Sequence, residues 1–551
     1  MTGTYTVGDL VADFLHALGV ETVFGIVSVH NIPMLDAIGR GNAIRFVMAR
    51  GEMGGAHMAD AYARVSGNLG VLFTSTGPGA ANAVPGLVEA RFGGAPLLHI
   101  TGQTQTADID TGHGAVHDVP DQLGMLASVS KKAFRVRSAD EALGTLIEAA
   151  TAALAPPMGP VSVEIPIDIQ RTRIDRPADL EGLVLPIPPA WAGDAGSLDR
   201  LADAVAGAKR PLLWCGNGAR HARAAVERLA DMGIAVVTSG AGRAVIPETH
   251  PMMLGAFHAG PVVEAFYETV DMMVVAGGRL RGHETRDLSM KLPETRVQID
   301  IDPAARGRTY TTDLFHTGEA GAALSAIADR LEGRLAVEDS YRAEIADLKT
   351  RIVETFRDTL GPYRDVPDAF ARAMGPDALW VRDVTLNNTT WGNRLLPLKE
   401  PGQNVYPIGA AIGPGLAMGI GAAFAAEGRK TVVMTGDGGF FLNVGELWTA
   451  VQENVQVAIV VMNDKGYGVI KHIQDALYGG RHFFGDLKAP SLEGLAELAG
   501  IPFGRVSAVG ELEGALRQAL DHHGPALVEV DMTAIGPYPP YYKPPPYAQK
   551  G

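Results

Sequence analysis

Short apolar runs alternate with amphipathic segments along most of the chain. Within the first 175 residues, apolar runs at 21–27, 68–74 and 96–102 are bounded by glycine or proline, and the segments between them repeat apolar residues at helical spacing. Buried strands that alternate with helices are typical of parallel βαβ units. We therefore expect a doubly wound α/β domain over residues 1–180.

The same alternation continues after a proline-rich passage at 185–196, which we interpret as a linker. It predicts a central Rossmann-like domain over 197–335 and a third domain over 360–535. The charged segment 338–358 is expected to be a solvated connecting helix. The proline- and tyrosine-rich tail, 536–551, is expected to be extended. The predicted fold class is α/β, with three doubly wound parallel-sheet domains.

Composition narrows the class of protein. A chain of 551 residues is too long for one hydrophobic core. Its net charge of −15 gives no basic surface for nucleic acid or an anionic membrane. Its one cysteine, Cys215, allows neither an intramolecular disulfide nor a thiolate metal cluster, and no segment resembles a signal peptide or membrane span. We expect a cytoplasmic protein that acts on small molecules.

An acidic residue inside a glycine turn points to a metal site. The apolar run TVVMT ends in GDGG, which places Asp437 where a helix begins, and the next run, VAIVVM, ends in Asn463 and Asp464. Backbone N–H groups at such a turn favour phosphate, whereas a bare carboxylate would repel it. A Mg²⁺ ion that bridges carboxylates and diphosphate resolves this conflict. A GDG alone is usually an ordinary turn, but the second acidic strand end, 27 residues after Asp437, favours the metal site.

These residues resemble the thiamine diphosphate motif, and the resemblance covers nearly the whole chain. The chain is similar to the acetolactate synthase, pyruvate oxidase and benzaldehyde lyase-like group of thiamine diphosphate enzymes. The matching segments, in order, are FGIVSVHNIPMLDAI, ARGEMGGAHMADAYARVSG, TSTGPGAANAV, ITGQTQTADIDTG, AIGPGLAMGIGAAFAAEG and NDKGYGVIKHIQ. The resemblance implies a pyrimidine-binding domain (1–180), a central domain (197–335) and a diphosphate-binding domain (360–535). It also implies a homodimer or homotetramer with the coenzyme at subunit interfaces.

Site residues follow from this resemblance. Asp437 and Asp464 would bind Mg²⁺ through their side chains, and Gly466 through its carbonyl oxygen. The positions expected to contact the coenzyme are Glu52, Thr76, Asn82, Asn387, Asn388, Ala410, Ile412, Gly436, Asp437, Gly438, Gly439, Asp464, Gly466, Tyr467 and Gly468.

Two of these residues have a specific implied role. Glu52 would hydrogen-bond the aminopyrimidine ring nitrogen and relay a proton, for which a carboxyl group in an apolar pocket is suited. The alternative is a glutamate that stabilises the start of the helix beginning there. Ile412 would be the apolar wedge that bends the coenzyme, and the alternative is an ordinary core residue.

Substrate-facing residues are expected on loops at strand ends. His30, His117 and Gln103 are the candidates for catalysis, with His472 a further one. A histidine taken at random is more often a surface or core residue than a catalytic one. Lys131 and Arg279 resemble basic residues that line the substrate or flavin region, although such residues are usually solvated.

The reaction itself is left open by departures from acetolactate synthases. VSV replaces PGG after FGI, glycine replaces histidine before Glu52, and Ile473 replaces a tryptophan. We expect a decarboxylase/carboligase acting on a 2-oxo acid. The alternatives are an acyloin lyase or aldehyde ligase, then an FAD-linked oxidase, and last a non-catalytic relative that binds the coenzyme. The glycine turn WCGNGA leaves FAD, ADP or no ligand open for the central domain.

Overall fold

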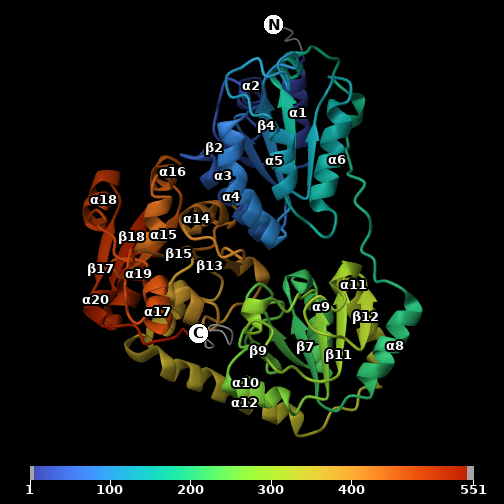
Figure 1. The fold of residues 1–551 in the computed structure, drawn as a ribbon, viewed down its shortest axis with the longest axis vertical. Coiled ribbons are helices and arrows are strands. Elements are labelled where there is room, and N and C mark those ends of the chain that lie inside the picture. The colour runs from blue at the N-terminus through green and yellow to red at the C-terminus, as the bar shows by residue number, and fades with distance from the viewer. Residues whose placement is uncertain (1–4, 543–551) are drawn as a thin grey trace.

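The computed structural model describes residues 5–542, and in these it contains three six-stranded parallel sheets, as predicted (Figure 1). The first sheet has the strand order β2-β1-β3-β4-β6-β5. Its strands are β1 (Thr22–Gly25), β2 (Arg45–Met48), β3 (Gly70–Thr74), β4 (Leu97–Gln103), β5 (Lys132–Arg135) and β6 (Val161–Pro166). The helices of this N-terminal domain are α1 (Val7–Ala17), α2 (Ile32–Gly41), α3 (Glu52–Ser66), α4 (Pro78–Gly93), α5 (Gln122–Val129), α6 (Ala142–Leu154), α7 (Ile167–Arg171) and the 3₁₀ turn η1 (Ala178–Leu180).

The central sheet has the order β12-β11-β10-β7-β8-β9. Its strands are β7 (Pro211–Cys215), β8 (Ala235–Thr238), β9 (Met253–Gly255), β10 (Met272–Ala276), β11 (Arg296–Asp300) and β12 (Leu314–Thr317). Its helical elements are α8 (Ala195–Ala206), η2 (Asn217–Ala219), α9 (Arg223–Asp231), α10 (Pro261–Tyr267), η3 (Gly282–Glu284), η4 (Pro303–Ala305) and α11 (Ala320–Leu331).

The third sheet, β14-β13-β15-β16-β18-β17, repeats the strand order of the first. Its strands are β13 (Leu379–Arg382), β14 (Asn404–Val405), β15 (Thr431–Gly436), β16 (Val457–Asn463), β17 (Phe503–Val506) and β18 (Pro525–Asp531). The helical elements of this C-terminal domain are α13 (Val366–Met374), η6 (Asn388–Gly392), η7 (Pro401–Gln403), α14 (Gly415–Phe424), α15 (Asp437–Leu442), α16 (Glu446–Gln452), α17 (Gly468–Leu477), α18 (Leu492–Ala499), η8 (Val509–Glu511), α19 (Leu512–Asp521) and α20 (Met532–Ile535).

The register of β15 and β16 positions the metal-binding candidates. The two strands are parallel neighbours, and Gly436 pairs with Met462. Both strands are buried apart from their last residues, which matches their unbroken apolar sequences. Asp437 and Asp464 therefore leave the sheet at the same edge, as the sequence pattern predicts.

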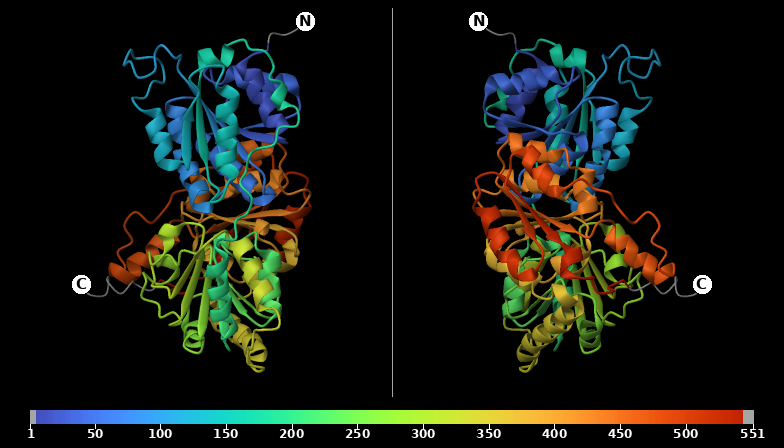
Figure 2. Two further views of the ribbon diagram at one scale, coloured as in Figure 1. Left: turned by 90° about the vertical axis from the view of Figure 1, so that its right-hand side faces the viewer. Right: turned by 90° about the vertical axis from the view of Figure 1, so that its left-hand side faces the viewer.

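The N-terminal and C-terminal domains share a core. Helices α3 and α14 pack against each other, and residues from both belong to one buried apolar cluster. Figure 1 shows these helices at the junction of the two domains, with α16 beside β2. A second buried cluster joins the central and C-terminal domains. Figure 2 shows the N-terminal domain stacked on the other two, and residues 181–194 running down one side to α8.

The connecting segment differs from the prediction. It forms α12 (Tyr341–Arg357), followed by η5 (Asp358–Tyr363), but α12 is not a solvated helix. Tyr341, Ile345, Leu348 and Ile352 are buried. They recur at helical spacing and face the core, so this helix is amphipathic. In the tail, residues 536–542 form neither helix nor strand, and 543–551 lie outside the described residues. Across residues 5–542, no helix is long and apolar enough to cross a membrane.

Candidate active site

Asp437 and Asp464 form an acidic pair at the edge of the C-terminal sheet. Asp437 is 1% exposed, and neither of its carboxylate oxygens has a hydrogen-bond partner within residues 5–542. Burial raises the pKa of Asp437. Burial and the adjacent charge of Asp437 raise the pKa of Asp464 to about 7. The charge of Lys471 acts in the opposite direction on Asp464, but it does not offset these two effects. Two adjacent carboxyl groups, one of them buried, favour a bound cation.

The glycines around this pair are required by close contacts. A Cβ atom at Gly468 would lie 1.8 Å from Oδ2 of Asp464, and one at Gly438 would lie 2.7 Å from the ring of Tyr467. Gly436 and Gly439 flank Asp437 in the turn that begins α15. The backbone therefore approaches the carboxylates closely, as a diphosphate-binding turn needs.

The residues present fit magnesium better than a transition metal. Within the described chain, no set of three or more His, Cys, Asp or Glu side chains could hold a metal ion. Mg²⁺ needs one or two carboxylates and completes its shell with carbonyl oxygen, phosphate and water. Asp437 and Asp464 provide two carboxylates at one sheet edge, which fits that requirement, and Gly466 lies two residues after Asp464.

The segment before α14 holds Ile412 outward. Asp383, at the end of β13, accepts hydrogen bonds from the backbone N–H groups of Gly413 and Gly415, at 3.0 Å each. Burial raises the pKa of Asp383 to about 6. Ala410 has a left-handed backbone, and Ile412 is 48% exposed. An exposed apolar side chain on a fixed turn does not support the alternative of a core residue and agrees with a wedge against a ligand.

Asn387 and Asn388 use their side chains inside the domain. Asn387 accepts a hydrogen bond from the indole N–H of Trp391 at 2.8 Å, and Asn388 accepts one from Arg382 at 2.8 Å. Both are almost fully buried. Their side chains are thus engaged in holding η6 and β13, which does not favour the predicted contact with diphosphate.

Glu52 begins α3 in the N-terminal domain and is 9% exposed. Its Oε2 accepts a hydrogen bond from Nδ2 of Asn82 at 3.3 Å. A Cβ at Gly79 would lie 2.9 Å from Oε1, so the glycine leaves room for the carboxylate. The N-cap residue of α3 is Gly51, which supplies no side-chain cap. Glu52 thus lies in the first turn of α3, where the alternative of a helix-stabilising glutamate also places it, and its carboxylate contacts Asn82 of α4.

His30 and His117 lie together at the ends of two loops. Their ring centroids are 5.1 Å apart, and Nδ1 of His117 lies 3.5 Å from the hydroxyl of Ser75. His30 Nδ1 is buried and has no hydrogen-bond partner in the described part of the chain. Burial, and then the charge of His117, lowers the pKa of His30. His30 is therefore neutral near pH 7 and has an unsatisfied ring nitrogen.

Gln103 belongs to a buried network and does not face an open site. Its Oε1 lies 3.0 Å from the hydroxyl of Thr76, and that hydroxyl lies 2.8 Å from Oε1 of Gln122. Nε2 of Gln122 donates to Glu164 at 2.9 Å. Gln122 and Glu164 were not among the predicted residues, and their partners are too distant in sequence for any local pattern to indicate them. The network fixes the loop after β3, on which Ser75 lies.

The remaining candidates are dispersed. His472, on α17, lies against the ring of Tyr541 with centroids 5.3 Å apart. Lys131 donates hydrogen bonds to the carbonyl oxygens of Ala152 and Ala155 at 2.7 Å, so it holds the end of α6. This contact corrects the expectation that Lys131 lines the substrate region.

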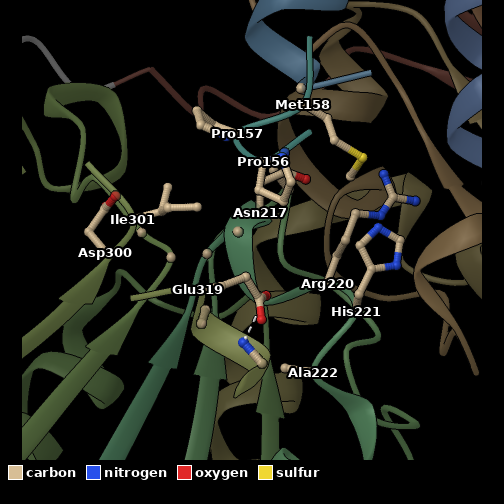
Figure 3. A pocket seen from close by; sticks show the side chains of 18 of the residues that line it. Pro156, Pro157, Met158, Asn217, Arg220, His221, Ala222, Asp300, Ile301 and Glu319 are labelled. Carbon is tan, nitrogen blue, oxygen red and sulfur yellow. Dashed lines mark hydrogen bonds between the residues drawn. The ribbon is translucent and has the colours of Figure 1, made fainter. Parts of the chain in front are cut away.

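The central domain contains a cavity of about 700 Å³ (Figure 3). Asn217, Arg220 and His221 line one part of it, Asp300 and Ile301 another, and Pro156 to Met158 reach it from the N-terminal domain. Arg279 also lines this cavity. Glu319 occupies the start of α11, where it accepts hydrogen bonds from the N–H groups of Gly321 and Ala322. The volume and the arginines fit a nucleotide-sized ligand.

Comparisons with known proteins agree with this arrangement. Residues 5–125, 198–327 and 386–530 match, in turn, the N-terminal TPP binding domain, the central domain and the C-terminal TPP binding domain of thiamine pyrophosphate enzymes. The chain is 30% identical over 533 residues to a probable 2-ketoarginine decarboxylase, AruI, of Pseudomonas aeruginosa, which covers 96% of this chain and 94% of that protein.

Two further relatives are acetolactate synthases. A probable large subunit from Methanocaldococcus jannaschii is 28% identical over 542 residues, covering 94% of this chain and 90% of the relative. The acetolactate synthase isozyme 3 large subunit of Escherichia coli is 29% identical over 552 residues, which cover 96% of this chain and 94% of the relative. With all three domains matched in order and a full-length relative at 30% identity, the chain belongs to the family of thiamine pyrophosphate-dependent enzymes.

Proposed function

We propose that this protein is a thiamine diphosphate- and Mg²⁺-dependent decarboxylase that transfers the remaining fragment of a 2-oxo acid to a second carbonyl compound. The observation that carries the proposal is the buried, unpartnered carboxylate of Asp437 beside Asp464. In the same chain, the N-terminal domain presents Glu52 in a shielded pocket.

The metal and diphosphate would be held by the C-terminal domain. Asp437, Asp464 and the Gly466 carbonyl supply the oxygen ligands, and the N–H groups at the start of α15 face the anion. Binding the cation removes the repulsion between the two carboxylates. The coenzyme, when bound, supplies a nucleophilic carbon that attacks the carbonyl group of the substrate.

Glu52 would hold and release the proton that activates the coenzyme. Its carboxylate is 9% exposed, and its Oε2 is oriented by Asn82, which leaves Oε1 available for a ligand. A carboxyl group within hydrogen-bond reach of a ring nitrogen can exchange a proton with it. The Gly79 contact fixes the position of Oε1.

The substrate class follows from the relatives and the histidine pair. Two of these relatives are named a probable 2-ketoarginine decarboxylase and a probable acetolactate synthase large subunit. Neutral His30 can donate or accept a hydrogen bond at a substrate carboxylate or carbonyl, and His117 lies beside it. In this proposal, both would move a proton during addition to the acceptor.

The second candidate is an acyloin lyase or aldehyde ligase, and the same histidine pair favours it. Cleavage of a 2-hydroxyketone requires a base at the hydroxyl group, a role that a neutral histidine can fill. Release of carbon dioxide separates the two reactions. The protein with thiamine diphosphate and Mg²⁺ would be incubated with a panel of 2-oxo acids, aldehydes and acyloins, while carbon dioxide and products are followed by mass. Carbon dioxide from a 2-oxo acid supports the proposal, and acyloin turnover without it supports the alternative.

A third candidate, an FAD-linked oxidase, is favoured only by the central cavity. The arginines that line it suit a diphosphate, and Asp300 lies at the end of β11, where a ribose would be expected. Flavin absorbance in the purified protein and oxygen uptake during turnover would identify that activity. ADP or flavin bound without oxygen uptake would leave the non-oxidative function in place.

We further propose a homodimer or a homotetramer with each site shared by two chains. Within residues 5–542, no hydrogen bond or ion pair joins Glu52 or His30 to Asp437 or Asp464. Exposed apolar side chains occur on the segments that carry both parts of the proposed site, in the N-terminal and the C-terminal domain. They are Val27, Val29, Val116, Ile412 and Leu442. A second copy that covers them would place Glu52 of one chain opposite Asp437 of the other.

A further inference from the structure

Two buried glutamates cross the junction between the N-terminal and C-terminal domains of one chain. Glu446, at the start of α16, contacts the segment before α3, and Glu89, on α4, contacts the segment before α14. Each is 2% exposed. Neither was predicted from the sequence, and neither belongs to the site described above.

Glu446 fixes the backbone directly before Glu52. Its carboxylate accepts hydrogen bonds from the N–H of Arg50 at 3.2 Å and the N–H of Gly51 at 3.1 Å. The hydroxyl of Thr449 donates to its second oxygen at 2.7 Å. A Cβ at Gly54 would lie 2.0 Å from Oε1, so the first turn of α3 is in direct contact with the carboxylate. Glu446 therefore holds the backbone that leads into α3 and places its carboxylate beside the start of that helix.

Glu89 fixes the segment that carries Ile412. Its carboxylate accepts hydrogen bonds from the N–H of Gly409 and, at 3.3 Å, from the N–H of Ala411. Arg64, from α3, donates to the carbonyl oxygen of Tyr406 at 2.8 Å in the same segment. Because Asp383 holds Gly413 and Gly415, Ile412 is fixed from both sides.

The two contacts are related by the repeated strand order of the two sheets. Counted along the chain, Glu52 follows the second strand of the first sheet, β2, and Ile412 follows the second strand of the third sheet, β14. Glu89 follows the third strand, β3, and Glu446 follows the corresponding strand, β15. Helices α3 and α14 pack against each other between these contacts (Figure 1). The arrangement is reciprocal, because each domain supplies one carboxylate to the other.

We propose that Glu446 and Glu89 are positioning residues, each set in one domain and holding the catalytic segment of the other. Glu446 sets the backbone position of Glu52, and Glu89 sets that of Ile412. The inference rests on the proposed function for the roles of Glu52 and Ile412. It adds that the junction within one chain determines the geometry of both halves of the active site.

The first test compares E446A, E446Q and E89A with the control E453Q. Glu453 ends α16 and forms an ion pair with Arg45 of β2 at 2.7 Å, so E453Q breaks a contact across the same junction away from the catalytic segments. Displacing Glu52 or the Ile412 turn should lower kcat about tenfold to hundredfold, with KM and coenzyme affinity changed less than about threefold. E446Q keeps one acceptor oxygen and should show an intermediate loss. E453Q should match the wild type.

Hydrogen exchange gives a readout that does not depend on activity. The amides of Arg50 and Gly51 should exchange faster in E446A and E446Q, and those of Gly409 and Ala411 faster in E89A, while E453Q leaves all four unchanged. If E446A does not fold, the kinetics and the hydrogen exchange of E446Q test the positioning role of Glu446. A folded E446A with kcat within about twofold of the wild type would overturn the proposal, as would an equal loss in E453Q.

A second test uses mixed dimers of E52Q and D437N chains. If sites are shared, the intact site combines Glu52 of the D437N chain with Asp437 of the E52Q chain. E446A should then impair activity when placed in the D437N chain and be silent in the E52Q chain, whereas E89A should show the opposite pattern. Equal effects in both placements would overturn the assignment. If the mixture of E52Q and D437N chains shows no activity even without E446A or E89A, the shared site is wrong. The kinetics of the single variants E446A and E89A then still test the positioning roles.

Discussion

The imidazole rings of His30 and His117 lie with their centroids 5.1 Å apart, inclined at 45°. The two residues are on different loops of the N-terminal domain, and the only other side chain hydrogen-bonded to either ring in the described chain is Ser75, through His117. A pair in which one buried ring nitrogen has no hydrogen-bond partner within residues 5–542 is suited to contact a substrate. It is less suited to stabilise the fold.

Replacing His30 with alanine is expected to lower turnover about tenfold to hundredfold and to change the ratio of carbon dioxide released to coupled product. The reason is the loss of a proton donor at the acceptor step. Both quantities would be measured in one reaction by gas and product analysis. His113, exposed on the same loop as His117, provides the control H113A, which should be silent. An unchanged ratio in H30A would show that His30 does not govern the acceptor.

Glu52→Gln is expected to leave the fold and coenzyme affinity largely intact and to reduce turnover at least about a hundredfold, because the amide cannot exchange the proton. Steady-state kinetics and calorimetric titration with coenzyme would be compared for the two proteins. Asn82→Asp is a second variant for comparison, because it removes the N–H group that donates a hydrogen bond to Oε2 of Glu52. Unaltered turnover in E52Q would reject the proton-relay role.

Mixing E52Q and D437N chains should restore activity if the sites are shared between subunits. Random assortment makes half of the dimers mixed, each with one intact site, so about a quarter of wild-type activity is expected. The mixture would be unfolded, refolded and assayed beside each variant alone. Activity that stays at the level of the single variants would place Glu52 and Asp437 of the same chain in one site.

Buried histidines should make the N-terminal domain sensitive to acid. His99 is buried between Thr74 and Ser162, and burial lowers its pKa to about 3. The unfolded chain binds this proton near pH 6.5, so the free energy of unfolding should fall as pH decreases from there toward 3, by up to about 1.4 kcal/mol per pH unit. The urea midpoint of the wild type should fall on acidification, and that of His99→Gln should fall less. If the urea midpoint depends on pH equally in both proteins, His99 is not the cause of the acid sensitivity.

Much of the fold was predictable because local sequence determines it. The apolar runs that end in Gly436 and Asn463 are strands that pair in parallel, and the acidic residues that follow them lie at one edge. That juxtaposition needs only the register of neighbouring parallel strands. The buried face of α12 was also readable from the spacing of Tyr341, Ile345 and Leu348, although its charge suggested a solvated helix.

The contacts that shape the site were not predictable. Glu446 contacts Gly51, 395 residues away in sequence, and Glu89 contacts Gly409, 320 residues away. No periodicity or motif connects such positions, since they meet only when α3 packs on α14. Asn387 and Asn388 illustrate the converse, because the family resemblance implied a coenzyme contact while their side chains bond inside the domain.

The most direct test of the central claim is calorimetric titration of the purified oligomer with thiamine diphosphate, with Mg²⁺ and after metal removal by a chelator. The account predicts saturable binding that requires Mg²⁺, and its loss in D437N with the fold intact by circular dichroism. Absence of magnesium-dependent binding in the wild type, or undiminished binding in D437N, would contradict the assignment of Asp437 and Asp464 as the metal site.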